Sequence, residues 1–333
     1  MRAFPITLPL LLVAASVGCK PDVGTPVSLI TGPTILAVRG DPAEATPEQQ
    51  VSYEVLAVDT DGRIPNADGP VSQPTLWAIC TTPKPPIETN AVSRDCLDGV
   101  ALPGQIGTTA NTFAAPMPVD ACALFGPITP PAKAGEPPIR PRDPDVTGGY
   151  YLPVRVSLWI PEGLRRPGMA GEDTLVAFGL ERIACDLANA PGSIPREYAA
   201  TYTLNQNPHL AGVTLDDGVN PPVRLMPAAV AHVGHGQKVT LEADWTDTSP
   251  ESYPAFDVLT RTLKTHRESL VVSWYATSGV FAHDSTGRGE DETDLTTTNE
   301  WTAGPAGLVH LWVVLRDSRG GTDFAAYDVE VDP

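Results

Sequence analysis

The fold is decided by the stretch GLVHLWVVLRD, which occupies residues Gly307–Asp317 near the end of the chain. Apolar residues stand at every second position of this stretch, and the side chains of a β-strand alternate between its two faces. The stretch therefore predicts a long strand with one buried face, formed by Val309, Leu311, Val313 and Leu315. A turn over residues 316–321 and an alternating stretch at Tyr327–Val331 follow, so the chain is predicted to end in a β-hairpin.

The same alternation recurs upstream in short stretches separated by turns. In the second half it predicts strands at Lys238–Trp245 and Ser269–Thr277. In the first half the predicted strands are Thr34–Arg39, Gln50–Asp59, Thr75–Thr81, Tyr151–Ile160 and Thr174–Cys185. Each half carries a tryptophan at the same place, Trp77 and Trp274, and then continues to its long alternating strand. Two copies of one β-sandwich explain this order.

The composition favours an all-β chain of two domains. Proline accounts for 36 of the 333 residues, and proline interrupts helices and the interior of sheets, so regular structure is confined to short strands between turns. We predict a first domain at residues 29–205, with a Pro-rich insert at about 116–148, and a second domain at residues 206–333.

The strand spacing and the tryptophan on a third strand resemble Ig-like β-sandwich domains. The closing stretch, Val309–Gly321 followed by Val329–Val331, looks like the closing hairpin of PKD-like or cadherin-like modules. This resemblance implies an all-β fold of two Ig-like β-sandwich domains in tandem. The chain lacks the cysteine pair that joins the two sheets of Ig domains, because Cys80 lies on the strand that carries the tryptophan. The layout is also similar to uncharacterised myxobacterial-type envelope lipoproteins, which implies a location and no activity.

Residues 1–18 have the pattern of a lipoprotein signal peptide. Arg2 supplies a positive charge, and an apolar run too short to span a bilayer leads to small residues before Cys19. These residues resemble the lipobox of bacterial lipoproteins, which implies that Cys19 is acylated and that residues 19–28 form a tether. In that family Lys20, in place of Asp, implies sorting to the outer membrane, on its periplasmic or its surface side. The alternative is an ordinary cleaved signal followed by an unpaired cysteine.

Charge and cysteine content narrow the partners. The chain has 22 basic and 40 acidic side chains, a formal net charge of −18, and such a surface repels phosphate backbones, so nucleic acid is excluded as a partner. Four cysteines remain after Cys19, and an even number in an exported chain predicts two disulfides. Three pairings are possible, of which we favour Cys80–Cys96 and Cys122–Cys185.

Catalytic motifs are missing from the sequence. It contains no Gly-x-Ser-x-Gly elbow and no phosphate-binding Gly-rich loop, and the pair His232 and His235 lacks the neighbouring Glu and the spacing of a metalloprotease helix. The one cofactor hypothesis is calcium, because carboxylates cluster on a Gly-containing loop. The candidate ligands are Asp284, Glu290, Asp291, Glu292 and Asp294. Ordinary turns, which also favour Asp and Gly, are the alternative.

Two aromatic residues, Tyr275 and Trp312, are predicted on the faces opposite the core. They are either ligand contacts or covered by the other domain or the Pro-rich insert. The sequence therefore predicts a non-enzymatic, lipid-anchored envelope protein that acts as a binding or scaffolding module, with an envelope protein or glycan as its partner. The alternatives are a carbohydrate- or peptidoglycan-binding accessory module and a cryptic hydrolase with a site between the domains.

Overall fold

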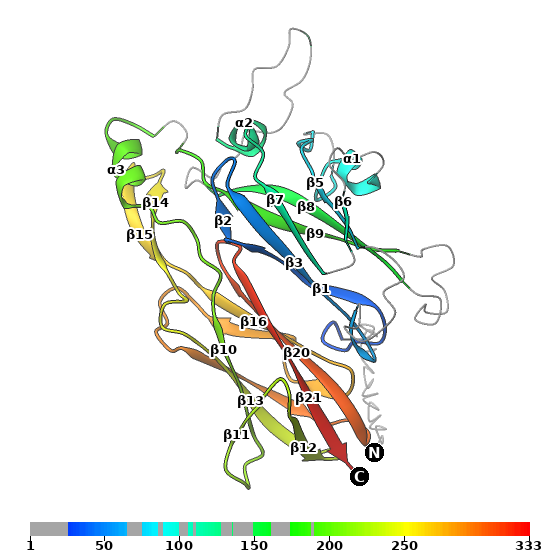
Figure 1. Ribbon diagram of the computed structural model, residues 1–333. Coiled ribbons are helices and arrows are strands. Elements are labelled where there is room, and N and C mark those ends of the chain that lie inside the picture. The colour runs from blue at the N-terminus through cyan, green and yellow to red at the C-terminus, as the bar shows by residue number, and fades with distance from the viewer. Residues whose placement is uncertain are drawn as a thin grey trace, which may run out of the picture.

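A computed structural model describes residues 26–64, 75–85, 89–99, 106–108, 111–127, 135, 149–160, 174–187 and 190–333. The signal segment, Cys19 and most of the Pro-rich insert lie outside these residues, so the predictions made for them stay predictions. Strands dominate the described part of the chain and form two β-sandwich domains in tandem (Figure 1). The predicted fold class is confirmed.

The first sandwich packs a sheet of order β1-β3-β4, with β7 also paired to β3, against a sheet of order β2-β9-β8-β5-β6. Its strands are β1 (Thr34–Asp41), β2 (Glu44–Ala45), β3 (Gln50–Asp59), β4 (Gly62–Ile64), β5 (Thr75–Ile79), β6 (Ile106–Thr108), β7 (Thr112–Pro116), β8 (Tyr150–Trp159) and β9 (Thr174–Ile183). Two short helices accompany them, α1 (Arg94–Asp98) and α2 (Ala121–Phe125). The alternating apolar sets of β3 and β8 meet in the core around Trp77, which is fully buried.

The second sandwich packs a sheet of order β11-β10-β13-β19-β17 against a sheet of order β12-β21-β20-β16-β18. Its strands are β10 (Leu210–Asp216), β11 (Val223–Arg224), β12 (Val230–Gly234), β13 (Lys238–Trp245), β16 (Leu270–Ala276), β17 (Val280–Phe281), β18 (Ser285–Arg288), β19 (Thr296–Thr302), β20 (Gly307–Asp317) and β21 (Thr322–Asp332). A separate hairpin is formed by β14 (Ser252–Asp257) and β15 (Thr262–Arg267), and α3 (Ile194–Thr201) precedes the domain. None of the helices in the described residues is long and apolar enough to cross a membrane.

The two domains share one topology. The order β1-β3-β7 of the first corresponds to β10-β13-β19 of the second, and β2-β9-β8-β5-β6 corresponds to β12-β21-β20-β16-β18. In both domains a short strand pairs in parallel with the last long strand, β2 with β9 and β12 with β21, whereas the other pairings are antiparallel. The internal repeat read from the sequence is therefore a repeat of the whole sandwich.

Some element predictions need correction. The final strand was predicted at Tyr327–Val331, but β21 begins at Thr322 because its first residues pair with the end of β20. The hairpin of β14 and β15 was not predicted, since its burial does not alternate strictly from residue to residue. Both predicted disulfides are present, Cys80–Cys96 across 16 residues and Cys122–Cys185 across 63 residues.

An apolar cluster joins the two sandwiches. It combines the outer face of β1 and β3 with the outer face of β20 and with Ile30; its buried members are Ile30, Leu36, Ala37, Leu56, Val58, Trp312 and Val314. Trp312 is only 2% exposed. The strand β20 is apolar on both faces, because one face lies in the core of its own domain and the other is buried against the first domain. The junction is therefore packed like a protein interior. We call this set the junction cluster.

Candidate functional site

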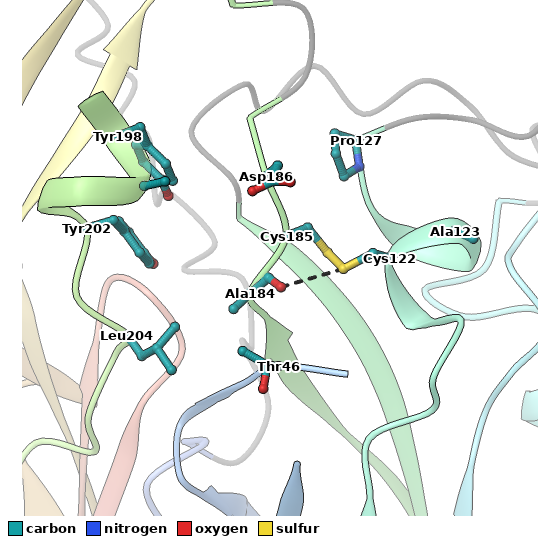
Figure 2. Close-up of a pocket in the computed structure, with 11 residues that line it drawn as sticks. Thr46, Cys122, Ala123, Pro127, Ala184, Cys185, Asp186, Tyr198, Tyr202 and Leu204 are labelled. Atoms are coloured by element: carbon teal, nitrogen blue, oxygen red, sulfur yellow. Dashed lines mark hydrogen bonds between the residues drawn. A yellow bond between two sulfur atoms is a disulfide. The ribbon is translucent and has the colours of Figure 1, made fainter. Parts of the chain in front are cut away.

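A groove of about 750 Å³ lies at the end of the first domain, beside the junction. Its lining comes from β2, α2, the end of β9 and α3: Thr46, Cys122, Ala123, Pro127, Ala184, Cys185, Asp186, Tyr198, Ala199, Tyr202 and Leu204. Figure 2 shows the tyrosines and Leu204 on one side and Pro127 with the disulfide on the other. The Cys122–Cys185 bridge fixes α2 to the end of β9, so one side of the groove is tied together by a covalent link. We call it the α2–α3 groove.

The wall of the groove is α3, a short helix with a clear local cause. Pro195 stands in its first turn, where a missing backbone N–H costs nothing, and Glu197 places a negative charge near its N-terminus. Tyr198 and Tyr202 are four residues apart and therefore lie on one face of the turn, where their rings stack with centroids 4.7 Å apart. Tyr198 is buried in a small cluster with Leu187 and Phe256, which fixes the helix to the β14–β15 hairpin.

The hydroxyl group of Tyr202 connects the groove with both domains. It donates a hydrogen bond to Glu44 Oε2 at 2.6 Å in the first domain. It accepts hydrogen bonds from Arg182 of the first domain and Arg319 of the second domain, both at 3.3 Å. Burial raises the pKa of Tyr202 to about 12, with the positive charges of Arg182 and Arg319 opposing the rise and Glu44 adding to it. The phenol is therefore protonated near neutral pH and serves as a fixed link between the domains.

The centre of the polar junction is Arg319, in the turn between β20 and β21. Its Nε lies 2.6 Å from Glu268 Oε1 and its Nη2 lies 2.7 Å from Glu251 Oε2. The guanidinium also stands over the ring of Tyr253, 4.6 Å from its centroid. Arg319 is 2% exposed, and a buried cation of this kind is tolerated because two carboxylates and an aromatic face surround it.

The surroundings of the carboxyl groups near Arg319 raise their pKa values. Burial raises the pKa of Glu268 to about 7, with the negative charge of Asp317 adding to the effect and Arg319 opposing it. Burial also raises the pKa of Glu251 and Asp317. Perturbed carboxyls can mark catalytic sites, but structural ion-pair networks perturb them as well. Both oxygens of Glu268 are occupied, by Arg319 and by the backbone N–H of Glu251, and Glu268 does not line the groove. Its role is therefore structural.

A second buried carboxyl, Glu181 on β9, lies apart from this network. It is 4% exposed, and its Oε1 has no hydrogen-bond partner. It borders a cavity of only about 10 Å³ together with Tyr53, whose hydroxyl is also unpaired. Burial raises the pKa of Glu181 to about 9, and the charges of Glu44 and Asp41 raise it further. Gly40 is required beside it, because a Cβ there would lie 1.9 Å from Glu181 Oε2.

Of the described residues that were predicted as site residues, only the disulfide cysteines Cys122 and Cys185 line the groove. Trp312 and Tyr275 are covered by the first domain in the junction cluster, which was one of the two alternatives. Three of the five acidic residues proposed for calcium form ion pairs with neighbouring side chains: Glu290 pairs with His266, and Glu292 and Asp294 pair with Arg288. No group of three or more His, Cys, Asp or Glu in the described residues is arranged to hold a metal ion.

Apart from Cys122 and Cys185, the residues that build the groove and the polar junction were missed in the sequence. Arg319 stands in a Gly-containing turn, where an arginine is usually solvated, so nothing local marked it. The helix α3 did leave a signal, because Pro195 follows Ser193 closely and two tyrosines recur four residues apart.

Comparisons with known proteins add little to this site. Family models and curated proteins give no match. Similar solved structures include the fibronectin(III)-like modules of Clostridium thermocellum CbhA, at 9% identity over 89% of this chain and 94% of that chain with a TM-score of 0.21. The D00-D0 domain of intimin matches at 8% identity over 91% and 99% with a TM-score of 0.23. Domains 4 and 5 of the S-layer protein SbsC match at 10% identity over 90% and 99% with a TM-score of 0.20. At these TM-scores the similarities carry no conclusion about function.

Proposed function

We propose that the chain is a non-catalytic module of the cell envelope, anchored by a lipid on Cys19, that binds a partner through the α2–α3 groove. The observation that carries this proposal is the rigid construction of the junction. Trp312 and Arg319 are both 2% exposed, and Tyr202 hydrogen-bonds to residues of both domains. The groove wall is therefore ordered before any partner arrives, which lowers the entropy cost of binding.

The lining of the groove indicates what it accepts. Apolar groups predominate, from Pro127, Leu204 and Ala199, while Asp186 supplies a polar group. This combination suits the apolar side chains of a partner protein oriented by one or two hydrogen bonds. Glu251 and Glu268, whose pKa is raised, are held by Arg319 rather than directed at the groove, which supports binding over catalysis.

The test is cross-linking of a tagged full chain in intact cells, followed by mass spectrometry. Ala199→Arg fills the groove, and Ala200→Arg, on the next exposed position of α3, is the matched control. We expect one dominant envelope partner with the native chain and the control, and its loss in Ala199→Arg. Identical cross-links in both variants would remove the groove from the proposal.

The anchor is tested separately with Cys19→Ala. We expect this variant to leave the membrane fraction, because the acyl chains supply the attachment. Retention of Cys19→Ala in the membrane fraction would contradict the lipid anchor and leave the groove result untouched.

A further inference from the structure

One edge of β9 is almost free of strand partners. Along its other edge β9 pairs with β8 over its full length, from Thr174 to Ile183. On the free side only β2 adds to it, at Arg182 and Ile183. Among the described residues no strand pairs with Thr174–Glu181 on this side.

The register shows which backbone groups this edge presents. Pro153 of β8 accepts a hydrogen bond from Cys80 N, so its carbonyl points toward β5. Its antiparallel neighbour Leu180 therefore directs its own N–H and C=O away from β8. Ala184 lies an even number of residues after Leu180 and so directs its backbone groups to the same side. Its N–H donates to the carbonyl of Ala45, next to this edge, which confirms the assignment. Val176, Phe178 and Leu180 thus present their backbone groups along the open edge.

The second domain shows how the equivalent edge is covered. There β12 pairs with β21 over five residues, Val230–Gly234 against Asp328–Asp332. Toward the start of β21, the N–H of Thr322 donates to the side chain of Asn207. The first domain has only the two residues of β2 in the same place. The fold therefore accepts a parallel strand at this position, and in the first domain most of that position is left open.

The open edge lacks the usual protection against strand addition. Natural edge strands are protected from further pairing by charged residues, proline or bulges. The stretch TLVAFGL from Thr174 to Leu180 contains no charged residue and no proline. Val176 is 42% exposed and Leu180 is 56% exposed. Both are apolar side chains that a neighbouring strand would cover.

A groove of about 440 Å³ runs beside this edge, between β1 and β9, and the turn after β20 closes it. Gly179 shapes it, because a Cβ there would lie 2.6 Å from Val38 Cγ1. A single added strand would direct alternate side chains into this groove. The edge of a second copy would instead bring its own sheet, whose inward side chains are committed to its own core, so the groove favours an isolated extended segment.

We propose that the free edge of β9 binds an extended segment of a partner polypeptide, which adds to the sheet as a strand in line with β2. The segment alternates apolar and small polar residues, and it carries neutral or basic flanks because this chain has a net charge of −18. This site is distinct from the α2–α3 groove and does not depend on it.

The test uses a nine-residue peptide that alternates threonine and valine between terminal lysines, added to the full chain. Hydrogen exchange is read at the backbone amides of Val176, Phe178 and Leu180. We expect these three to exchange quickly in the free protein and about tenfold more slowly with peptide, because strand addition hydrogen-bonds them. The same peptide with every backbone amide N-methylated keeps its side chains, but it has no N–H donors and its methyl groups block both edges, so it is expected to give no protection.

The matched variants are Leu180→Lys on the open edge and Val271→Lys on β16, a strand paired on both sides and similarly exposed. We expect Leu180→Lys to raise the peptide Kd about tenfold and Val271→Lys to leave it unchanged. Equal protection by the N-methylated peptide would overturn the proposal. Protection that rises with protein concentration in the absence of peptide would also overturn it, because the occupant would then be a second copy. The N-methyl comparison holds even if Leu180→Lys fails to fold.

Discussion

The buried carboxyl of Glu181 makes the stability of the first domain depend on pH. The pKa of Glu181 is raised from 4.5 to about 9 in the folded chain. Between these values the folded state holds a proton that the unfolded state releases. The free energy of unfolding therefore falls as pH rises through this window, by at most about 1.4 kcal/mol per pH unit for one proton. Below pH 4.5 the group contributes its full stabilisation.

The window can be chosen so that Glu181 is separated from Glu268. The pKa of Glu268 is about 7. Both groups therefore lower the free energy of unfolding as pH rises from 4.5 to 7, whereas from pH 7 to 9, of these two groups, Glu181 alone lowers it. Over those two units the native chain is expected to lose up to about 3 kcal/mol more than Glu181→Gln, which cannot ionise. The amide matches the carboxylic acid in size, so it should fit the space beside Gly40 and Tyr53.

The measurement is urea unfolding of the native chain and of Glu181→Gln at several values of pH from 6 to 9, at constant ionic strength. Glu242→Gln, on the exposed face of β13, is the control and should follow the native chain. Parallel pH profiles for the native chain and Glu181→Gln would refute the reasoning, because they would show that Glu181 titrates alike in both states.

Three further outcomes follow from the junction and the bridges. Trp312→Ala should cost about 3–5 kcal/mol, because a large buried side chain leaves a cavity, and limited proteolysis should then cut between the domains; a resistant variant would contradict a shared interior. Arg319→Met should cost about 3 kcal/mol by leaving the buried Glu268 and the half-buried Glu251 without a cation, and adding Glu268→Gln should restore part of it in urea melts; a double variant no more stable than the single one would argue against their coupling. Removing the Cys122–Cys185 disulfide should destabilise the chain by about 1 kcal/mol more than removing Cys80–Cys96, since it closes a longer loop. Equal losses of stability in thermal melts would speak against loop entropy as the cause.

Much of the fold could be predicted because strand burial leaves a periodic trace. The strands β3, β13 and β20 have the predicted bounds, since one face of each lies in a sandwich core and the alternation is strict there. The pattern was less informative where both faces are covered. Val314 and Trp312 of β20 point away from the core, and only the first domain explains why they are apolar.

The candidate site was harder to predict from the sequence, because its residues meet across long sequence distances. Glu44, Arg182, Tyr202 and Arg319 come from four separate segments, and each alone resembles an ordinary surface residue. Their common environment is created by the docking of two domains, for which no local pattern exists. The cysteines were an exception, because their pairing is a choice among few alternatives.

The junction cluster also determines when, during synthesis of the chain, the apolar outer face of the first domain becomes covered. The first sandwich contributes the outer face of β1 and β3, which is complete once the chain has been made to about residue 183. Its cover, Trp312 and Val314, lies on the next-to-last strand. A chain that emerges N-terminus first must therefore carry an uncovered apolar face until β20 appears, and such faces invite aggregation. Truncation before β20 would leave this face uncovered permanently.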